Sequence, residues 1–322
     1  MIAVPPPPGN AILFVDERHG WAGGRGGLVG TRDGRRFVLE SHAHIVGISA
    51  VSRTRAWGIT SAGRVLRTID GLHWQQLVSP HLVRLRFVDS RRGFAITRHG
   101  VLVRSVDGGH IWRRMHSPGA VQSLCFADAR NGIVARGGTV WLTRDGGHRW
   151  QRRRLLPDRG GYPVPELDCR GRDRWVLFHE GVAAGSEGYV VFRSGDGGAR
   201  WRPVLANLDL AFTRRAPRIS SGYSGPFDVL GAGRAIFVGI CGPCGKQPTG
   251  TIARTANGGR SWQRMTPFDG VRVDGVSFLD LRRGFALTSS REGKRRVGAI
   301  WRTSEGGGFW TGLATSSVLA PS

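Results

Sequence analysis

Residues 143–150 read TRDGGHRW, and close variants of this phrase recur along the chain. Each copy begins with Ser or Thr, has an acidic or amide residue two positions later, and continues through glycine to an aromatic residue. We call each copy a box. The other boxes are TRDGRRF at 31–37, TIDGLHW at 68–74, SVDGGHIW at 105–112, SGDGGARW at 194–201, TANGGRSW at 255–262 and TSEGGGFW at 303–310. The acidic or amide residues of the seven boxes are Asp33, Asp70, Asp107, Asp145, Asp196, Asn257 and Glu305.

A second motif precedes several boxes and extends the repeat. It has an apolar pair, an acid, a short polar run, a glycine and a further apolar segment. The copies are FVDERHGWA at 14–22, FVDSRRGFA at 87–95, FADARNGIVA at 126–135 and FLDLRRGFA at 278–286. Short apolar segments bounded by Gly, Asp and Arg are typical of strands joined by tight turns. Each repeat therefore predicts four strands, with the acidic turn between the first two and the box between the last two.

The spacing of the boxes predicts the architecture. Successive acidic or amide positions are 37, 37, 38, 51, 61 and 48 residues apart, and four-stranded units of about 40–50 residues are typical of β-propeller blades. We predict an all-β, seven-bladed β-propeller of four-stranded antiparallel blades, with residues 1–322 forming one domain. The predicted blades cover about 11–40, 45–78, 82–116, 120–155, 162–205, 225–266 and 271–314.

Two features of this architecture need separate mention. The sequence leaves open whether Met1–Val4 or Val318–Ala320 adds a strand that closes the ring. The chain has no run of eighteen apolar residues, so we expect no membrane-spanning helix.

The box resembles the Asp-box, or BNR, repeat of sialidases, sortilin-type receptors and some glycosidases. The wider unit, with its F-x-D…G-F/W-A strand pair, is most similar to the photosystem II stability and assembly factor-like propellers. This resemblance covers nearly the whole chain. It implies a propeller that acts as a binding scaffold or assembly factor, although a fold does not by itself fix a function.

The box can be explained as a turn. An Asp carboxylate can accept hydrogen bonds from backbone N–H groups that no strand ladder satisfies, and glycine can adopt a positive φ. Asn257 and Glu305 replace aspartate in two boxes, so the repeat does not require the titration of one Asp side chain. We therefore interpret the boxes as structural, and we assign no catalytic residue, cofactor or metal to them.

A glycan-active enzyme is the alternative to a scaffold. Glycoside hydrolases use paired carboxylates, and the candidates outside the boxes are Glu180, Glu187 and Asp209. A sialidase is less favoured, because its chemistry needs a tyrosine nucleophile and this chain has three tyrosines, none in a recognisable context. The Arg-Ile-Pro signature of sialidases is also absent near the start.

Longer connections predict a binding surface. Insertions fall in blades 5–7 and belong to one end of the propeller, and insertions on one face of a repeat protein are typical of a binding site. Arginine there could bind carboxylates, phosphates or sulfates. The candidate binding residues are Arg153, Tyr162, Arg214, Arg215, Arg218, Tyr223, Lys246, Arg291, Lys294, Arg295 and Arg296.

The charge of the chain favours an anionic partner. The formal net charge is +24, which attracts acidic proteins and acidic glycans. The composition limits this argument, because 45 of the 47 basic residues are arginine and only Lys246 and Lys294 are lysines, a ratio that codon bias can produce. Nucleic acid is not favoured, because no recognised binding motif accompanies the charge. We expect a monomer that binds a protein, with an acidic glycan as the alternative.

Two predictions concern the four cysteines. Cys241 and Cys244 form a Cys-Gly-Pro-Cys sequence after an apolar strand, where a local disulfide is favoured over a redox site, since a redox site needs a helix N-terminus. Cys125 and Cys169 fall on the first strands of adjacent blades and are expected to be small core residues. No signal peptide precedes the first blade. An exposed cysteine pair nevertheless favours export slightly, if the chain begins later than the natural protein.

Overall fold

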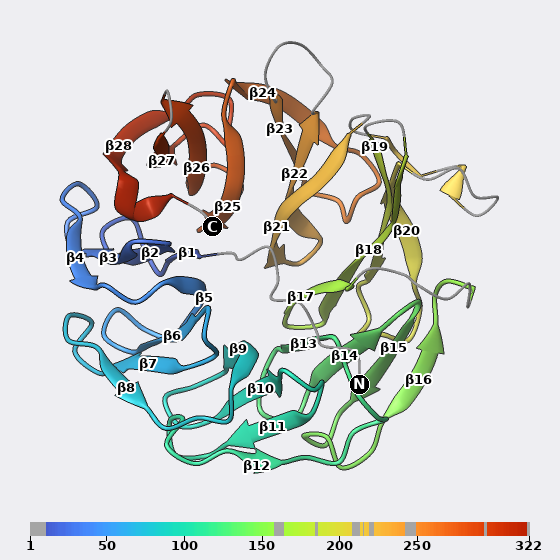
Figure 1. Cartoon of the computed structure of the whole chain (residues 1–322). Helices are drawn as coiled ribbons and strands as arrows, with labels where there is room; N and C mark the ends of the chain where they lie inside the picture. Colours follow the sequence, from blue (N-terminus) through green and yellow to red (C-terminus); the bar gives the residue numbers. More distant parts are fainter. Residues whose placement is uncertain are drawn as a thin grey trace.

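The computed structural model describes residues 11–157, 164–183, 186–207, 213–214, 216–218, 222–241, 249–292 and 295–320, with backbone alone for 180–183, 186, 241, 249, 269 and 292. Its strands form seven four-stranded antiparallel sheets around a central axis (Figure 1). In every sheet the order of the strands follows the order of the chain. The predicted seven-bladed β-propeller is therefore confirmed.

The strands of the first four blades have the following bounds. Blade 1 contains β1 (Ile12–Phe14), β2 (Gly20–Gly24), β3 (Gly27–Thr31) and β4 (Val38–Ser41), and blade 2 contains β5 (Ile45–Ala50), β6 (Ala56–Thr60), β7 (Val65–Thr68) and β8 (Gln75–Leu77). Blade 3 contains β9 (Leu82–Phe87), β10 (Gly93–Thr97), β11 (Leu102–Ser105) and β12 (Arg113–Arg114), and blade 4 contains β13 (Ser123–Phe126), β14 (Gly132–Arg136), β15 (Thr139–Thr143) and β16 (Gln151–Arg154).

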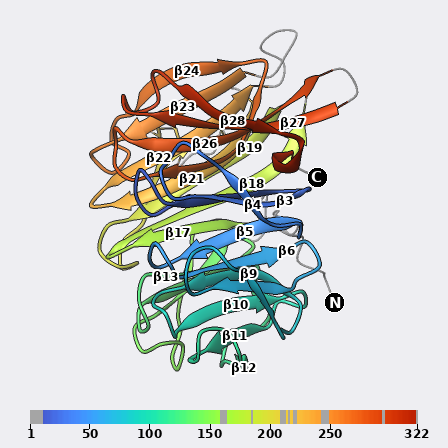
Figure 2. The same cartoon turned by 90° about the vertical axis from the view of Figure 1, so that its left-hand side faces the viewer.

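The last three blades have longer strands. Blade 5 contains β17 (Glu166–Arg170), β18 (Asp173–Ala183), β19 (Ser186–Ser194) and β20 (Arg202–Ala206), and blade 6 contains β21 (Tyr223–Gly231), β22 (Arg234–Cys241), β23 (Thr249–Thr255) and β24 (Gln263–Asp269). Blade 7 contains β25 (Arg272–Phe278), β26 (Gly284–Glu292), β27 (Arg295–Thr303) and β28 (Thr311–Ser316). The β26–β27 hairpin extends beyond the ring on the side of the C-terminal turn η2 (Ser317–Leu319), as Figure 2 shows.

The first strand of each blade lies nearest the axis and the fourth lies at the rim (Figure 1). The second motif explains how the inner strand turns into its neighbour. In blades 1, 3, 4 and 7 the motif's phenylalanine ring covers the motif's glycine, and a Cβ on Gly132 would lie 2.4 Å from the Phe126 ring. A side chain at that position would overlap the ring, so the motif pairs an aromatic residue with glycine.

Aromatic stacking joins neighbouring blades. Phe126 of blade 4 stacks on Phe94 of blade 3 with ring centroids 3.6 Å apart, and Phe14 of blade 1 stacks in the same way on Phe285 of blade 7. The box tryptophan then meets the stacked ring edge-on, as Trp150 meets Phe126 at 6.4 Å. Because burial of aromatic rings stabilises packed sheets, the core of this protein lies between the blades.

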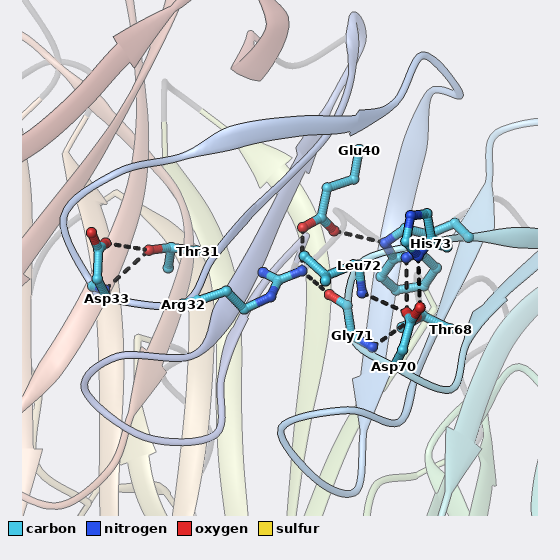
Figure 3. A network of polar contacts seen from close by, with 11 residues as sticks. Thr31, Arg32, Asp33, Glu40, Thr68, Asp70, Gly71, Leu72 and His73 are labelled. Carbon is cyan, nitrogen blue, oxygen red and sulfur yellow. Dashed lines mark hydrogen bonds and ion pairs between the residues drawn. The ribbon is translucent and has the colours of Figure 1, made fainter.

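The boxes form the turns between the third and fourth strands. Figure 3 shows the first two, where Asp70 Oδ1 accepts hydrogen bonds from the backbone N–H groups of Leu72 (2.8 Å) and His73 (2.9 Å) and from the Thr68 hydroxyl (3.0 Å). The hydroxyl also accepts from Gly71 N, three residues on. These bonds satisfy the N–H groups of the turn, and together with the His73 side chain they lower the pKa of Asp70.

The later boxes are wider by one residue. In the third box Ser105 Oγ accepts from Gly109 N, four residues on, and Asp107 accepts from the N–H groups of His110 and Ile111, each at 3.0 Å. Asn257 keeps one such bond, from Ser261 N at 3.0 Å. In the described part of the chain the Glu305 carboxylate accepts none, and Thr303 Oγ1 accepts from Glu305 N and Gly307 N.

A polar network ties blade 1 to blade 2 at the rim (Figure 3). Glu40 on β4 accepts a hydrogen bond from the indole N–H of Trp74 at 2.7 Å and is paired with Arg32, which also donates to the Gly71 carbonyl. Burial raises the pKa of Glu40, although both partners favour its charged form. Box residues thus connect blades as well as close turns.

The C-terminal turn closes the ring between blades 7 and 1. Arg25 N donates to Ala320 O at 2.8 Å and Gly26 N donates to Val318 O at 3.0 Å, while Leu319 is buried between β2, β3 and β27. This segment contains a 3-10 turn rather than an added strand. Each blade therefore keeps four strands of its own, and Met1–Val4 lies outside the described residues.

A repeated bond joins inner strands around the axis. In each inner strand one residue pairs with a tryptophan, phenylalanine or isoleucine of the second strand, and we call this residue the ring position. The ring positions are Leu13, Ser49, Arg86, Cys125, Asp168, Asp228 and Ser277. Where this residue is Ser or Asp, its side chain accepts a backbone N–H of the next blade's inner strand, as Ser277 Oγ does from Phe14 N at 2.9 Å.

Cysteine occupies the ring position of blade 4, where the structure contains a bond that the sequence analysis did not predict. Cys125 and Cys169 are buried, as expected, but they form a disulfide between the inner strands of blades 4 and 5, with Cα atoms 6.0 Å apart. The two residues are 44 positions apart, and their neighbours along the chain give no sign that they meet. The side chains of Cys241 and Cys244, for which a local disulfide was expected, lie outside the described residues.

Candidate functional site

The inner strands surround a central cavity of about 1300 Å³. Its wall includes backbone and side chains of all seven blades, because the first strand of each blade faces the axis. Midway along it, two carboxylates and several arginines come from blades 3, 5 and 6. These groups, the cluster beside them and the turns at the mouth are the polar features that could bind a ligand.

The two carboxylates belong to ring positions. Asp168 Oδ2 accepts from Val229 N at 2.8 Å and Asp228 Oδ2 accepts from Phe278 N at 2.6 Å, so each joins its own blade to the next. Burial raises the pKa of Asp168, and burial together with the charge of Asp168 raises the pKa of Asp228 to about 7. Asp228 is thus partly protonated at neutral pH.

The arginines of blade 3 face the same cavity. Arg84 and Arg86 are two positions apart on β9, and alternate residues of a strand point to the same side. Arg84 Nε donates to Gln122 O at 2.8 Å, whereas its buried Nη2 has no hydrogen-bond partner. Burial lowers the pKa of Arg84 to about 10, so it stays charged at neutral pH. Arg86 has no hydrogen bond or ion pair with any residue that the structure describes.

One of the predicted catalytic candidates, Glu187, belongs to a cluster of polar side chains from blades 5 and 6. His179 on β18 lies between Glu187 (Nδ1 to Oε1, 2.8 Å) and Glu166 (Nε2 to Oε1, 3.4 Å), and Ser224 Oγ lies 2.8 Å from Glu187 Oε2. Burial disfavours a charge on His179, but the two glutamates outweigh it and raise its pKa to about 9. Glu187 is half-buried, and although burial opposes its charge, the His179 contact keeps its pKa below the usual range.

This cluster is an ion pair rather than a catalytic triad. His179 is protonated at neutral pH and cannot accept a proton from Ser224, whose hydroxyl lies 3.0 Å from His179 Nδ1 and donates to Glu187 Oε2 at 2.8 Å. Glu187 thus contacts both His179 and Ser224. The Glu180 side chain and all of Asp209, the other two predicted candidates, lie outside the described residues.

Exposed arginines that our sequence analysis did not single out lie at the turns between the first and second strands of the blades, at one end of the propeller. Every blade has one within, or directly after, the turn from its first to its second strand, and Arg18 and Arg53 line the cavity itself. Arg53 is paired with Asp16 at 2.5 Å. We call this set the arginine ring: Arg18, Arg53, Arg91, Arg130, Arg172, Arg234 and Arg282.

Most of the arginine ring is unpaired. The side chains of five members have no ion pair or hydrogen bond with the residues described here, namely Arg18, Arg91, Arg130, Arg172 and Arg282. The aspartates of these turns already accept hydrogen bonds from backbone N–H groups. Asp89 Oδ1, for example, accepts from the N–H groups of Arg91 and Arg92 at 2.8 Å. A signal for this ring was visible in the sequence, because F-x-D-x-R occurs in four repeats.

The predicted binding residues are spread more widely than expected. Arg291, Arg295 and Arg296 are exposed and face one another across the β26–β27 hairpin, where Arg291 pairs in register with Arg296. Arg214 and Arg218 are exposed, and Tyr223 is half-buried at the start of β21. Arg153 was expected in a loop but lies in the rim strand β16, where its guanidinium donates to Arg152 O at 2.9 Å. Tyr162, Arg215, Lys246 and Lys294 lie outside the described residues.

Two features are absent from the described residues. The described residues contain no group of three or more His, Cys, Asp or Glu side chains placed to hold a metal ion. Among the same residues no helix is long and apolar enough to cross a membrane.

The fold and this surface define a seven-bladed propeller with a polar central cavity. No family model and no curated protein matches the chain, so the comparisons rest on solved structures. "YCF48 bound to D1 peptide" is 18% identical with a TM-score of 0.57, covering 89% of this chain and 92% of that one. YCF48 from Cyanidioschyzon merolae is 16% identical with a TM-score of 0.59, covering 89% and 95%.

An enzyme shares the fold as well. The GH74 xyloglucanase from Xanthomonas campestris is 13% identical with a TM-score of 0.61, and the match covers 96% of this chain and 54% of the enzyme. At such identities the likeness concerns the fold alone. Neighbours that bind a peptide and neighbours that cleave a polysaccharide therefore share this architecture.

Proposed function

We propose that this protein is a non-enzymatic scaffold that binds an acidic segment of a partner protein on the arginine ring. The observation that carries the proposal is the presence of an exposed arginine at the equivalent turn of all seven blades, five of them without an ion pair or hydrogen bond to any residue that the structure describes. An arginine without a partner keeps all its donors for an incoming carboxylate, and charge-assisted bonds of this kind are about twice as strong as neutral ones.

Three further observations support this proposal. The net charge of +24 would draw an acidic partner towards the protein. The solved structure of YCF48 with a D1 peptide indicates that a propeller of this fold can bind a peptide. Finally, Glu187 is held by His179 and Ser224, so the one catalytic candidate whose side chain is described has a structural partner.

The basic hairpin of blade 7 is the second candidate surface. It carries Arg291, Arg295 and Arg296 on the end of the ring opposite the arginine ring, where the longest connections lie. We keep it as part of the proposal, because long exposed loops often form binding sites. The two surfaces are on opposite ends of the propeller, so mutations can separate them.

Matched charge reversals test the proposal. The first variant combines Arg91→Glu, Arg130→Glu and Arg282→Glu, and the second combines Arg214→Glu, Arg291→Glu and Arg295→Glu, so both change the charge equally. Binding of a synthetic fifteen-residue peptide rich in Asp and Glu is then measured at several salt concentrations. We expect the first variant to bind at least about tenfold more weakly than the wild type, and the second to lose much less.

The other possible outcomes would contradict the arginine ring as the binding site. A larger loss in the second variant would move the site to the β26–β27 hairpin. Equal losses in both, with the same salt dependence, would mean that the peptide senses only the total charge. Cross-linking of the wild type and of the unaffected variant in cell extracts, followed by mass spectrometry, would then identify the natural partner.

A glycan-active enzyme remains a second candidate because of one observation. Asp168 and Asp228 lie close enough in the cavity for their pKa values to be coupled, and the pKa of Asp228 is raised to about 7, as a general acid requires. Incubation with xyloglucan and other polysaccharides tests this candidate. Release of reducing sugar by the wild type but not by Asp228→Asn would support the enzyme and contradict a purely binding role.

We further propose that the protein is exported. The Cys125–Cys169 disulfide supports this, because disulfides persist in oxidising compartments. Fractionation of the native host with an antibody tests the location, and recovery of the protein solely in a reducing compartment would contradict it.

A further inference from the structure

We propose that Arg84 and Arg86 form a binding site for a small oxyanion (a carboxylate, sulfate or phosphate) inside the central cavity. The site is separate from the arginine ring, because the two residues lie along the wall on β9 rather than in the turn that follows it. It does not depend on the function proposed above.

The first argument is the missing partner. Arg84 Nη2 is buried and makes no hydrogen bond, and Arg86 is half-buried without an ion pair to any described residue. A guanidinium removed from water normally has a counterion, since burying an unpaired charge is costly. Both side chains line a cavity of about 1300 Å³, which leaves room for an anion and its water.

The second argument concerns the acids nearby, which are poor counterions. Asp168 and Asp228 already accept backbone N–H groups of neighbouring blades. Burial raises the pKa of both carboxyls, and the pKa of Asp228, raised to about 7, leaves that residue with less than a full negative charge at neutral pH. Glu166, the remaining acid on this wall, is within 3.4 Å of the protonated His179.

The third argument is the charge balance. The groups that face Asp228 from the elements around it are Asp168 and Arg170 on β17, Arg86 on β9 and the backbone N–H of Phe278 on β25. Arg170 is exposed and also lines the cavity. Three arginines thus share this wall with Asp168, a partly protonated Asp228 and a paired glutamate, which leaves net positive charge for a bound oxyanion.

Titration calorimetry on the full chain tests the site, with sodium sulfate, phosphate and acetate each compared with chloride at constant ionic strength. We expect one saturable site per chain for at least one oxyanion. Arg86→Gln should weaken that binding about tenfold, because one charge-assisted contact is lost. Arg113→Gln removes the same charge from the exposed rim strand β12 and should change binding about twofold or less.

A second variant keeps the proposal testable if Arg86→Gln does not fold. Asp228→Asn keeps an oxygen that can accept from Phe278 N but removes the negative charge opposite the anion. It should tighten binding at pH 8 about threefold or more, since like charges repel, and it should reduce the difference that the wild type shows between pH 6 and pH 8. No saturable binding by the wild type, equal losses in Arg86→Gln and Arg113→Gln, or unchanged binding in Asp228→Asn would each overturn the proposal.

Discussion

The Cys125–Cys169 disulfide joins blades 4 and 5 at the position where a hydrogen bond joins blades 5 and 6. In the next junction Asp168, at the ring position of blade 5, accepts Val229 N of blade 6. In blade 4 the same position holds Cys125, which is bonded covalently to the residue after Asp168. One junction of the ring therefore depends on the redox state of the protein, whereas the others do not.

Reduction should destabilise the wild-type protein. A disulfide that closes a loop of this length stabilises by about 2–5 kcal/mol, so dithiothreitol should lower the midpoint of urea unfolding. The double variant Cys125→Ser/Cys169→Ser should have a lower midpoint from the start and should not respond to dithiothreitol. Peptide mapping without reduction identifies the bond directly, and an equal response of both proteins to dithiothreitol would show that another bond is responsible.

Alkaline pH should weaken the ion pairs of His179 within blade 5. The folded pKa of His179 is about 9, above its usual 6.5, so its contribution is complete below pH 6.5 and is lost as the pH rises through 9. The shift corresponds to a contribution of about 3 kcal/mol. We expect the unfolding free energy to fall between pH 7 and pH 10, and few other groups titrate there, since the chain has only two lysines.

His179→Gln provides the comparison for that experiment. It should be less stable than the wild type at pH 7 and should lose less stability between pH 7 and pH 10. His73→Gln, at an exposed histidine in a box, serves as the control and should follow the wild type. Identical pH profiles for all three proteins would contradict the role of His179.

Gly132→Ala should destabilise the protein strongly. The new Cβ would lie 2.4 Å from the Phe126 ring, and overpacking of a core costs about 1–3 kcal/mol or more. Gly47→Ala is the matched control, because a Cβ there meets nothing within 4 Å. Chemical denaturation of the two variants measures the difference, and equal stability would mean that the ring can move aside without cost.

The boxes should differ in importance. Asp107→Ala removes an oxygen that accepts two backbone N–H groups and the Ser105 hydroxyl, so the melting temperature should fall by about 2 °C or more. Glu305→Ala should have little effect, because its carboxylate accepts no bond in the described structure. Differential scanning calorimetry distinguishes the two, and a larger fall for Glu305→Ala would contradict the turn geometry.

Sequence alone determined the number of blades and the order of their strands. The regular recurrence of DGG and tryptophan reports a local rule, since each turn is formed by residues within about four positions of one another. The same local information contained the arginine ring, in the F-x-D-x-R of four repeats, although our sequence analysis attributed those arginines to composition.

Tertiary structure alone decided which residues meet across blades. Cys125 and Cys169, His179 and Glu187 with Ser224, and Arg86 with Asp168 and Asp228 belong to different strands, and most belong to different blades. Their positions relative to one another depend on how far each sheet is rotated about the axis when the ring closes. That rotation is set by packing between whole blades, and the repeated sequence motifs do not specify this packing.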